Sequence, residues 1–104
     1  MTIAELIITI KVNLVADVKK PDLKANVTLN FSDKFRVSGI SIRKSQYDSE
    51  FNFEGVPLFV GYPGNKKPNN SVFYFFSIIS PEFKKELEKA IMDEYLSATI
   101  PIIN

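Results

Sequence analysis

The chain has 104 residues, of which 45% are hydrophobic and 24% charged, a composition ordinary for a soluble globular protein. Thirteen basic and twelve acidic residues leave a net charge of +1, so any binding to nucleic acid or membranes must come from uneven placement of charge. The absence of Cys and His excludes disulfides, thiolate metal sites, Cys nucleophiles and imidazole bases, and no metal or other cofactor is expected.

The first half of the chain predicts three strands. Apolar and polar residues alternate over 8–14, and they alternate without a break over 23–32. The turn at 32–34 is short, so the run 35–44 is predicted to be the antiparallel partner of the second strand. No basic leader and no stretch of about 18 apolar residues precede or interrupt these strands, which indicates neither a signal peptide nor a membrane span.

The third predicted strand contains a break in its alternation. Phe35 and Val37 share one face, whereas Ile40 and Ile42 are out of phase with them. One extra residue beside Gly39 restores the register, and glycine supplies the unusual backbone angles that such an insertion needs. The sequence therefore predicts a β-bulge at this position.

The second half begins with a segment that has no clear period. Residues 45–55 are polar, mostly acidic and carry three aromatic rings, which predicts a long loop. A short strand is predicted over 56–63, and a turn containing two lysines follows it over 64–70. Residues 71–79 are apolar on both faces, which predicts a central strand covered on both sides.

A single helix is predicted after these strands. Ser80 is the expected N-cap, Pro81 the first helical residue, and an apolar stripe then recurs at helical spacing up to Tyr95. The predicted fold class is α+β: an antiparallel sheet of about five strands with one C-terminal helix packed on one face, in a single two-layer domain over 1–104. One helix covers one face, so the other face, the two-sided strand and the apolar tail 99–104 predict a dimer.

Three stretches of the chain resemble the bacterial stage V sporulation protein G (SpoVG, septation protein) family. "TLNFSDKFRVSGISI" is similar to that family's strand, acidic turn and second strand. "LFVGYPGNKKPNN" is similar to its strand-turn stretch, in which a Lys follows a Pro, and "IISPEFKKELEKAIMDEYLSA" is similar to its last strand end and helix. The resemblance covers about two-thirds of the chain, from Leu29 to Ala98.

The resemblance implies a particular kind of protein. Members of the SpoVG family are small dimeric α+β proteins that influence sporulation, septation and gene expression, and several bind DNA or RNA. A cytoplasmic, non-enzymatic regulator that binds nucleic acid is therefore expected, with a second copy of itself and DNA or RNA as partners, and with no membrane or small-molecule substrate.

The candidate contacts with nucleic acid are basic residues in loops and at strand ends, since phosphate contacts provide most of the non-specific affinity. They are Lys34, Arg36, Arg43, Lys44, Lys66 and Lys67. The candidate dimer interface consists of Phe73, Tyr74, Phe75, Ile102 and Ile103. The sequence leaves open a second interpretation, in which these basic residues are only solvent-exposed side chains at strand ends and at a hairpin tip, with no binding role.

Another class of function fits the same sequence. In a protein-interaction module, the acidic, ring-bearing loop 45–55 and the tail 99–104 form the contacts, and the basic residues only interact with water. Catalysis has little support, because the adjacent acids Asp93 and Glu94 point apart on a helix and form no converging pair.

Overall fold

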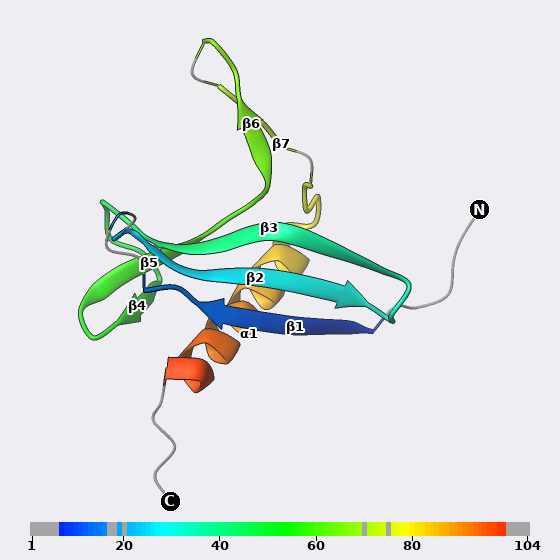
Figure 1. The fold of residues 1–104 in the computed structure, drawn as a ribbon, viewed down its shortest axis with the longest axis horizontal. Coiled ribbons are helices and arrows are strands. Elements are labelled where there is room, and N and C mark those ends of the chain that lie inside the picture. Colours follow the sequence, from blue (N-terminus) through cyan, green and yellow to red (C-terminus); the bar gives the residue numbers. More distant parts are fainter. Residues whose placement is uncertain (1–6, 17–18, 20, 70, 75, 100–104) are drawn as a thin grey trace, which may run out of the picture.

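The protein consists of a curved antiparallel sheet, a helix across one face of that sheet, and a two-stranded arm that projects from it (Figure 1). This computed structural model describes residues 7–16, 19, 21–69, 71–74 and 76–99, and only the backbone of Lys66. The elements in chain order are β1 (Ile8–Leu14), β2 (Leu23–Phe31), β3 (Phe35–Lys44), β4 (Phe51–Phe53), β5 (Val56–Gly61), β6 (Gly64–Lys66), β7 (Val72–Tyr74) and α1 (Pro81–Thr99).

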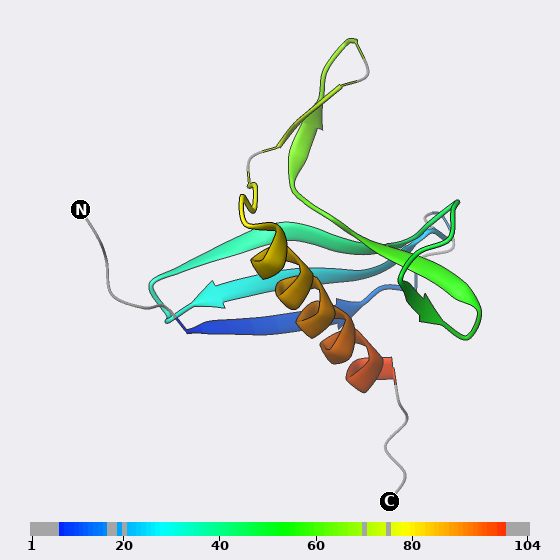
Figure 2. The ribbon, with the colours of Figure 1, turned by 180° about the vertical axis from the view of Figure 1, so that it is seen from behind.

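The main sheet has five strands in the order β1-β2-β3-β5-β4, and each neighbouring pair is antiparallel. Figure 2 shows α1 lying diagonally across one face of this sheet. The predicted α+β class, with about five strands and one C-terminal helix, is therefore confirmed. The structure contains one copy of the chain, and the predicted dimer remains a proposal.

The core forms between α1 and the side chains that face it from the three central strands. Strict alternation places every second residue of β2 on this face, which explains why the segment 23–31 forms a strand. The helix contributes a stripe at helical spacing. The buried core residues are Ala25, Val27, Leu29, Ile40, Ile42, Leu58, Val60, Leu87, Ile91, Met92 and Tyr95.

The predicted bulge in β3 is present. Val27 pairs with Ile40 and Leu29 pairs with Val37, so β3 has one more residue than β2 between the two pairs. Gly39 has a φ of +86°, a backbone conformation that a side chain would strain. The extra residue returns Ile40 to the helix side of the sheet, where it is fully buried.

The helix begins as the sequence predicts. The Ser80 hydroxyl accepts a hydrogen bond from the Phe83 backbone N–H at 3.2 Å, which satisfies one of the N–H groups that have no partner within the helix. Pro81 follows as the first helical residue, where its missing N–H costs nothing. The helix then extends to Thr99, and Thr99 donates its hydroxyl hydrogen bond to the Leu96 carbonyl at 2.8 Å.

Three of the predicted elements were wrong. The turn expected over 64–70 begins with the strand β6, which pairs with β7. The loop expected over 45–55 contains the short strand β4, which pairs with β5 through a tight turn at Glu54 and Gly55, both with positive φ. The central strand expected over 71–79 is only the short strand β7, and it lies outside the main sheet. It pairs with β6 alone, and its three side chains are exposed, so it is covered on neither side.

Candidate nucleic-acid interface

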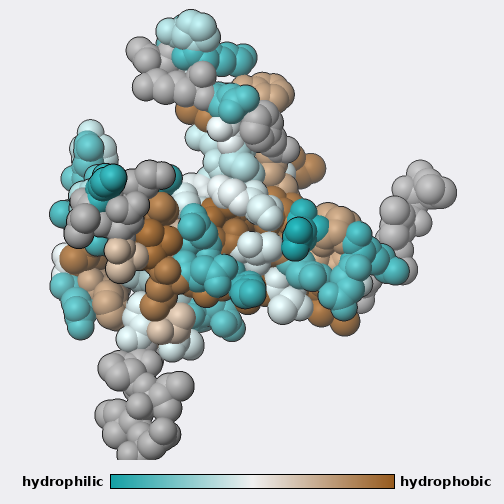
Figure 3. Space-filling model, viewed as in Figure 1, coloured by the Kyte–Doolittle hydropathy of each residue, from teal (hydrophilic) through white to brown (hydrophobic). Residues whose placement is uncertain are grey.

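The face of the sheet opposite α1 is uncovered by the described chain and is polar. Figure 3 views the molecule from this side and shows mainly hydrophilic and intermediate side chains over the middle of the sheet. The strand register places residues of four strands in rows, such as Asn13, Asn26, Ser41 and Gly61 across β1, β2, β3 and β5. We call this surface the open face. Because this face is polar, it needs no apolar cover, and the predicted dimer remains a prediction.

The open face carries positive charge and its strands contribute no acidic residue, although Asp33 in the β2–β3 turn accepts a hydrogen bond from the Asn30 side chain at 3.2 Å. Lys11 of β1 lies opposite Thr28, and Arg36 of β3 lies opposite Asn30. Lys24 lies between two buried residues of β2, and residues alternate between the two faces of a strand, so Lys24 belongs to the open face. Arg43 lies near the end of β3. None of the seven described strands contains an Asp or a Glu. A phosphate on this surface therefore meets cations, hydroxyls and amides but no strand carboxylate.

Arg43 is held in position by its neighbours. Its Nε donates a hydrogen bond to the Ser41 hydroxyl at 3.1 Å, and Ser41 is itself buried. Gly61 lies opposite Ser41, and a Cβ at Gly61 would come within 2.9 Å of the Ser41 hydroxyl oxygen. Glycine at this position therefore leaves room for the hydroxyl that orients the guanidinium. Phe59, opposite Arg43, adds a partly exposed ring to the same surface.

Five of the twelve acidic residues lie on the helix layer, and the others are in turns and loops or outside the described residues. The helix carries five acidic residues and three lysines, which gives it a net charge of −2. The acids are Glu82, Glu86, Glu88, Asp93 and Glu94, and all except the partly buried Glu88 are exposed. The two layers therefore differ in the sign of their charge, although the whole chain is nearly neutral.

The predicted basic contacts lie at three separate places. Lys34 and Arg36 are at the β2–β3 turn, and Lys44 is at the far end of the ten-residue β3, about 30 Å away by the usual strand rise. Lys67 is at the tip of the β6–β7 arm, where its ammonium lies 5.6 Å from the centre of the Phe73 ring. Lys66 is in β6, and its side chain lies outside the described part. Within one chain, these pairs do not converge.

The stretch that contains Lys66 and Lys67 is more than a chain reversal. The chain leaves β5, passes Pro63 and runs outward as β6, then returns as β7 to form the arm (Figure 1). The Lys67 N–H donates to the Ser71 carbonyl at 2.7 Å and closes the tip. The lysines thus stand at the end of a projecting arm.

The predicted dimer-interface residues are only partly described. Phe73 is 55% exposed and Tyr74 is 51% exposed, on opposite sides of β7. Together with the exposed Val72, they give the arm an apolar surface. Phe75, Ile102 and Ile103 lie outside the described residues. Exposure of two neighbouring rings agrees with a contact surface, and the contact itself remains a proposal.

The rings of segment 45–55 have different environments. Phe51 and Phe53 pack against the core, and the Phe53 ring meets the Tyr95 ring edge-on at a centroid distance of 6.0 Å. Tyr47 is 78% exposed. Two of the three rings assigned to a protein-contact loop are therefore used in folding.

Tyr62 links the base of the arm to the helix. Its hydroxyl donates a hydrogen bond of 2.5 Å to the Glu88 carboxylate. Lys84 and Glu88 are spaced for an i,i+4 pair on the helix, but Glu88 binds Tyr62, and the Lys84 ammonium lies 5.8 Å from the centre of the Tyr62 ring. Burial, followed by the hydrogen bond and the negative charge of Glu88, raises the pKa of the Tyr62 phenol far above its ordinary value.

Other kinds of site have no support in the described part of the chain. Its residues contain no cluster of three or more acidic side chains able to hold a metal ion. Among these same residues, no helix is both long and apolar enough to cross a bilayer.

Comparison with known proteins identifies the family. The SpoVG family model matches residues 5–97. The chain belongs to the SpoVG family. A search among curated proteins found no match. The matched span includes the main sheet, the arm and most of α1, so the resemblance expected from three stretches extends over nearly the whole chain. Membership associates this small protein with sporulation and septation, in a family that is not known for enzymes.

Two basic residues of the open face escaped the sequence prediction. Lys11 and Lys24 were read only as the polar phase of alternating strands, because each stands alone among neutral neighbours. The signal was nevertheless present: the first two strands contain no acidic residue, and both lysines fall on the polar phase. Pairing of β1 with β2 and of β2 with β3 then places the basic residues of three strands on one surface.

Proposed function

We propose that this SpoVG-family protein is a non-catalytic, cytoplasmic regulator of sporulation, septation or gene expression, which binds nucleic acid on its open face and acts as a homodimer. The supporting observation is the distribution of charge between the layers. The strands carry Lys and Arg but no acid, whereas the helix behind them is net negative. Phosphate groups are therefore attracted more strongly to the sheet layer than to the helix, whose net charge is negative.

The surface suits contact along a phosphate backbone. Cations at Lys11, Lys24, Arg36 and Arg43 are separated by amide and hydroxyl side chains, which can donate hydrogen bonds to phosphate and sugar oxygens. Four cations per chain make affinity modest and dependent on salt, with a slope of about −0.7 for each phosphate that is neutralised on a single strand. A homodimer doubles this surface.

The arm supports the homodimer. A two-stranded hairpin alone is marginally stable in water, and this one exposes Val72, Phe73 and Tyr74. A second copy that covers the Phe73 side of the arm removes apolar area from water at about 25 cal/mol per Å² and leaves Tyr74, on the opposite side of β7, uncovered. Contact between arms also brings two open faces into one particle, which supports binding to a continuous strand.

The alternative protein-interaction module is less well supported by the geometry. Phe51 and Phe53 pack inward, so among the rings of segment 45–55 only Tyr47 is left largely exposed. An interface of ordinary size needs a cluster of well-packed anchors, and one exposed tyrosine offers a single anchor. The tail beyond Thr99 lies outside the described residues.

The test compares two double variants that remove the same charge from opposite layers. Lys11→Gln with Arg36→Gln removes two cations from the open face, whereas Lys85→Gln with Lys89→Gln removes two from the helix. We choose Arg36 over Arg43 because loss of the Arg43–Ser41 bond would affect folding as well. Fluorescence anisotropy measures binding to labelled 12-nucleotide single strands, dT12 and rU12, from low to physiological salt.

We expect the open-face variant to bind about tenfold more weakly at low salt, with a salt slope smaller by about 1.4. The helix variant should bind as the unmodified protein does. Equal losses in both variants would contradict the open face as the contact surface, and an absence of binding by the unmodified protein would contradict nucleic-acid binding. The ratio of dT12 to rU12 affinity reports the preferred type of nucleic acid.

A further inference from the structure

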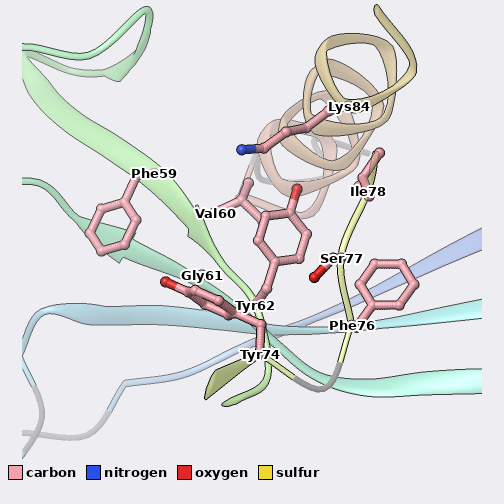
Figure 4. Close-up of a pocket in the computed structure, with 9 residues that line it drawn as sticks. All are labelled: Phe59, Val60, Gly61, Tyr62, Tyr74, Phe76, Ser77, Ile78 and Lys84. Atoms are coloured by element: carbon pink, nitrogen blue, oxygen red, sulfur yellow. The ribbon is translucent and has the colours of Figure 1, made fainter. Parts of the chain in front are cut away.

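A ring-lined cleft lies where the arm leaves the main sheet. Its walls come from the end of β5, the start of the arm, the segment after β7 and the first turn of α1 (Figure 4). Phe59 belongs both to this cleft and to the open face. A strand bound along the open face therefore reaches the mouth of the cleft without leaving the surface.

Aromatic side chains dominate the lining. Figure 4 shows Phe59 and Tyr62 on either side of Val60, and Tyr74 and Phe76 also line the cleft. Gly61 adds no side chain to this part of the lining. The cleft has a volume of about 350 Å³, at the small end of the range for ligand sites. It is thus sized for one flat ring system and not for a large ligand.

The polar groups in the cleft are few and differ in role. The Lys84 ammonium lies near the Tyr62 ring, 5.8 Å from its centre, and the Ser77 hydroxyl lies between Tyr62 and Phe76 (Figure 4). The Tyr62 hydroxyl is already engaged with Glu88, which fixes its ring as a wall. The cleft therefore offers ring faces for stacking, one cation, and one hydroxyl that can donate or accept.

We propose that this cleft binds one unstacked base of a single-stranded nucleic acid, with an adjacent phosphate on Lys84. The inference rests on the proposed function of the open face and adds a site to it. Bases in a single strand stack on aromatic side chains whatever their sequence, whereas bases inside a duplex cannot turn into such a cleft. Single strands should consequently bind more tightly than the duplex of the same length.

The first test separates base contacts from backbone contacts. Tyr74→Leu removes a ring of the cleft but keeps an apolar side chain on the arm, and Phe35→Leu, at a similarly exposed ring of β3 outside the cleft, is its matched control. The probes are labelled dT12 and an abasic strand of the same length, which has the same charge and no bases. Tyr74→Leu should weaken binding to dT12 by about fivefold or more and leave the abasic strand unchanged.

The second test concerns the cation. Lys84→Gln should weaken binding to both strands and reduce the salt slope by about 0.7, because it removes one phosphate contact. Lys85→Gln, the next residue on the same helix, lies outside the cleft lining and should change neither quantity. The mass of each variant in solution is measured in parallel, so that a change in assembly is recognised.

The outcomes distinguish this site from the open face. The cleft holds no base if the Tyr74→Leu variant binds dT12 as tightly as the unmodified protein does. The same conclusion follows if its affinity for dT12 and its affinity for the abasic strand fall by the same factor. The proposed function then still stands, provided that Lys11→Gln with Arg36→Gln weakens binding to both strands. If the unmodified protein binds neither strand, both the open face and the cleft are excluded as nucleic-acid sites.

Discussion

Tyr62 is the residue at which the arm, the sheet and the helix meet. It follows the last residue of β5, and its hydroxyl reaches Glu88 on α1, 26 residues later in the chain. Its ring also lies 6.1 Å from the Phe76 ring, centre to centre, on the returning segment. One side chain therefore ties both the outgoing and the returning segments of the arm to the helix.

Tyr62 makes the free energy of unfolding depend on pH in the alkaline range. Its raised pKa means that the folded state keeps the phenolic proton at pH values where the unfolded chain loses it, above about 10. Above this pH the folded state binds more protons than the unfolded chain, so the free energy of unfolding falls as the pH rises. Below about pH 10 the contribution of Tyr62 to the free energy of unfolding is at its full value. Tyr62→Phe should reduce this fall by at most about 1.4 kcal/mol per pH unit.

Urea unfolding between pH 8 and 11 measures the effect. Burial raises the pKa of Tyr95 as well, so part of the fall should persist in Tyr62→Phe. Tyr47→Phe changes an exposed phenol and is the matched control, which should retain the full fall. An identical pH dependence in the Tyr62 and Tyr47 variants would show that the Glu88 contact does not hold the proton.

For single residues, the sequence predicts those features that depend only on residues nearby in the chain. The N-cap at Ser80 and the bulge at Gly39 follow from local spacing, and both are present. The contact between Tyr62 and Glu88 depends on the path of the chain over 26 residues, and no local pattern announces it. Spacing on the helix instead favoured Lys84 as the partner of Glu88, and the tertiary contact prevails over it.

Among the elements, the arm is the one least connected to the rest. Its two strands pair only with each other, and close packing between them depends on Gly64. A Cβ at Gly64 would lie 2.6 Å from the Phe73 carbonyl oxygen, a distance that requires the backbone to move. The position is therefore restricted by space and not by an unusual φ.

Gly64→Ala should open the arm and leave the main sheet intact. Backbone amides of β6 and β7 should exchange hydrogen about tenfold faster, since their cross-strand bonds are strained, while protection in β2 and β3 stays unchanged. Hydrogen exchange followed by mass spectrometry makes the measurement. Asn65→Ala, one residue along the same strand, is the matched control and should leave the arm protected. Unchanged exchange in Gly64→Ala would show that the arm accommodates the methyl group.

The errors in the predicted elements have a common physical cause. Residues 72–76 would place apolar side chains on both faces of a strand. A buried central strand and an exposed arm that contacts a partner both have this pattern. The two cases differ in whether these residues are buried, and burial depends on which other segments of the folded chain pack against them. The strand β4 was missed because three residues are too few to establish a period, although Glu54 and Gly55 form a tight turn directly after it.

For the whole molecule, assembly is the property with the clearest consequence. The homodimer should have twice the 11.8 kDa mass of one chain, measured by light scattering at micromolar concentration. Phe73→Asp places a charge on the apolar side of the arm and should shift the mass to that of one chain, because an unpaired charge is costly to bury. Tyr47→Asp, at an exposed ring outside the arm, should keep the mass of the unmodified protein.

Two results would contradict assembly through the arm. The unmodified protein could have the mass of one chain across the whole concentration range. Alternatively, Phe73→Asp could retain the dimer mass, which would place the contact elsewhere. Circular dichroism of each variant verifies that the sheet and helix are folded, so that a change in mass reports assembly and not unfolding.

The order β1-β2-β3-β5-β4 also determines where the sheet stops growing. Its outer strands are β4, with only three residues, and β1, which carries Lys11 at its centre. Short edges and lysine-bearing edges are two ways in which proteins prevent strands of neighbouring molecules from adding on. Copies of this protein are thus discouraged from joining edge to edge into extended sheets, and the projecting arm remains as the apolar surface through which two copies can meet in a closed pair.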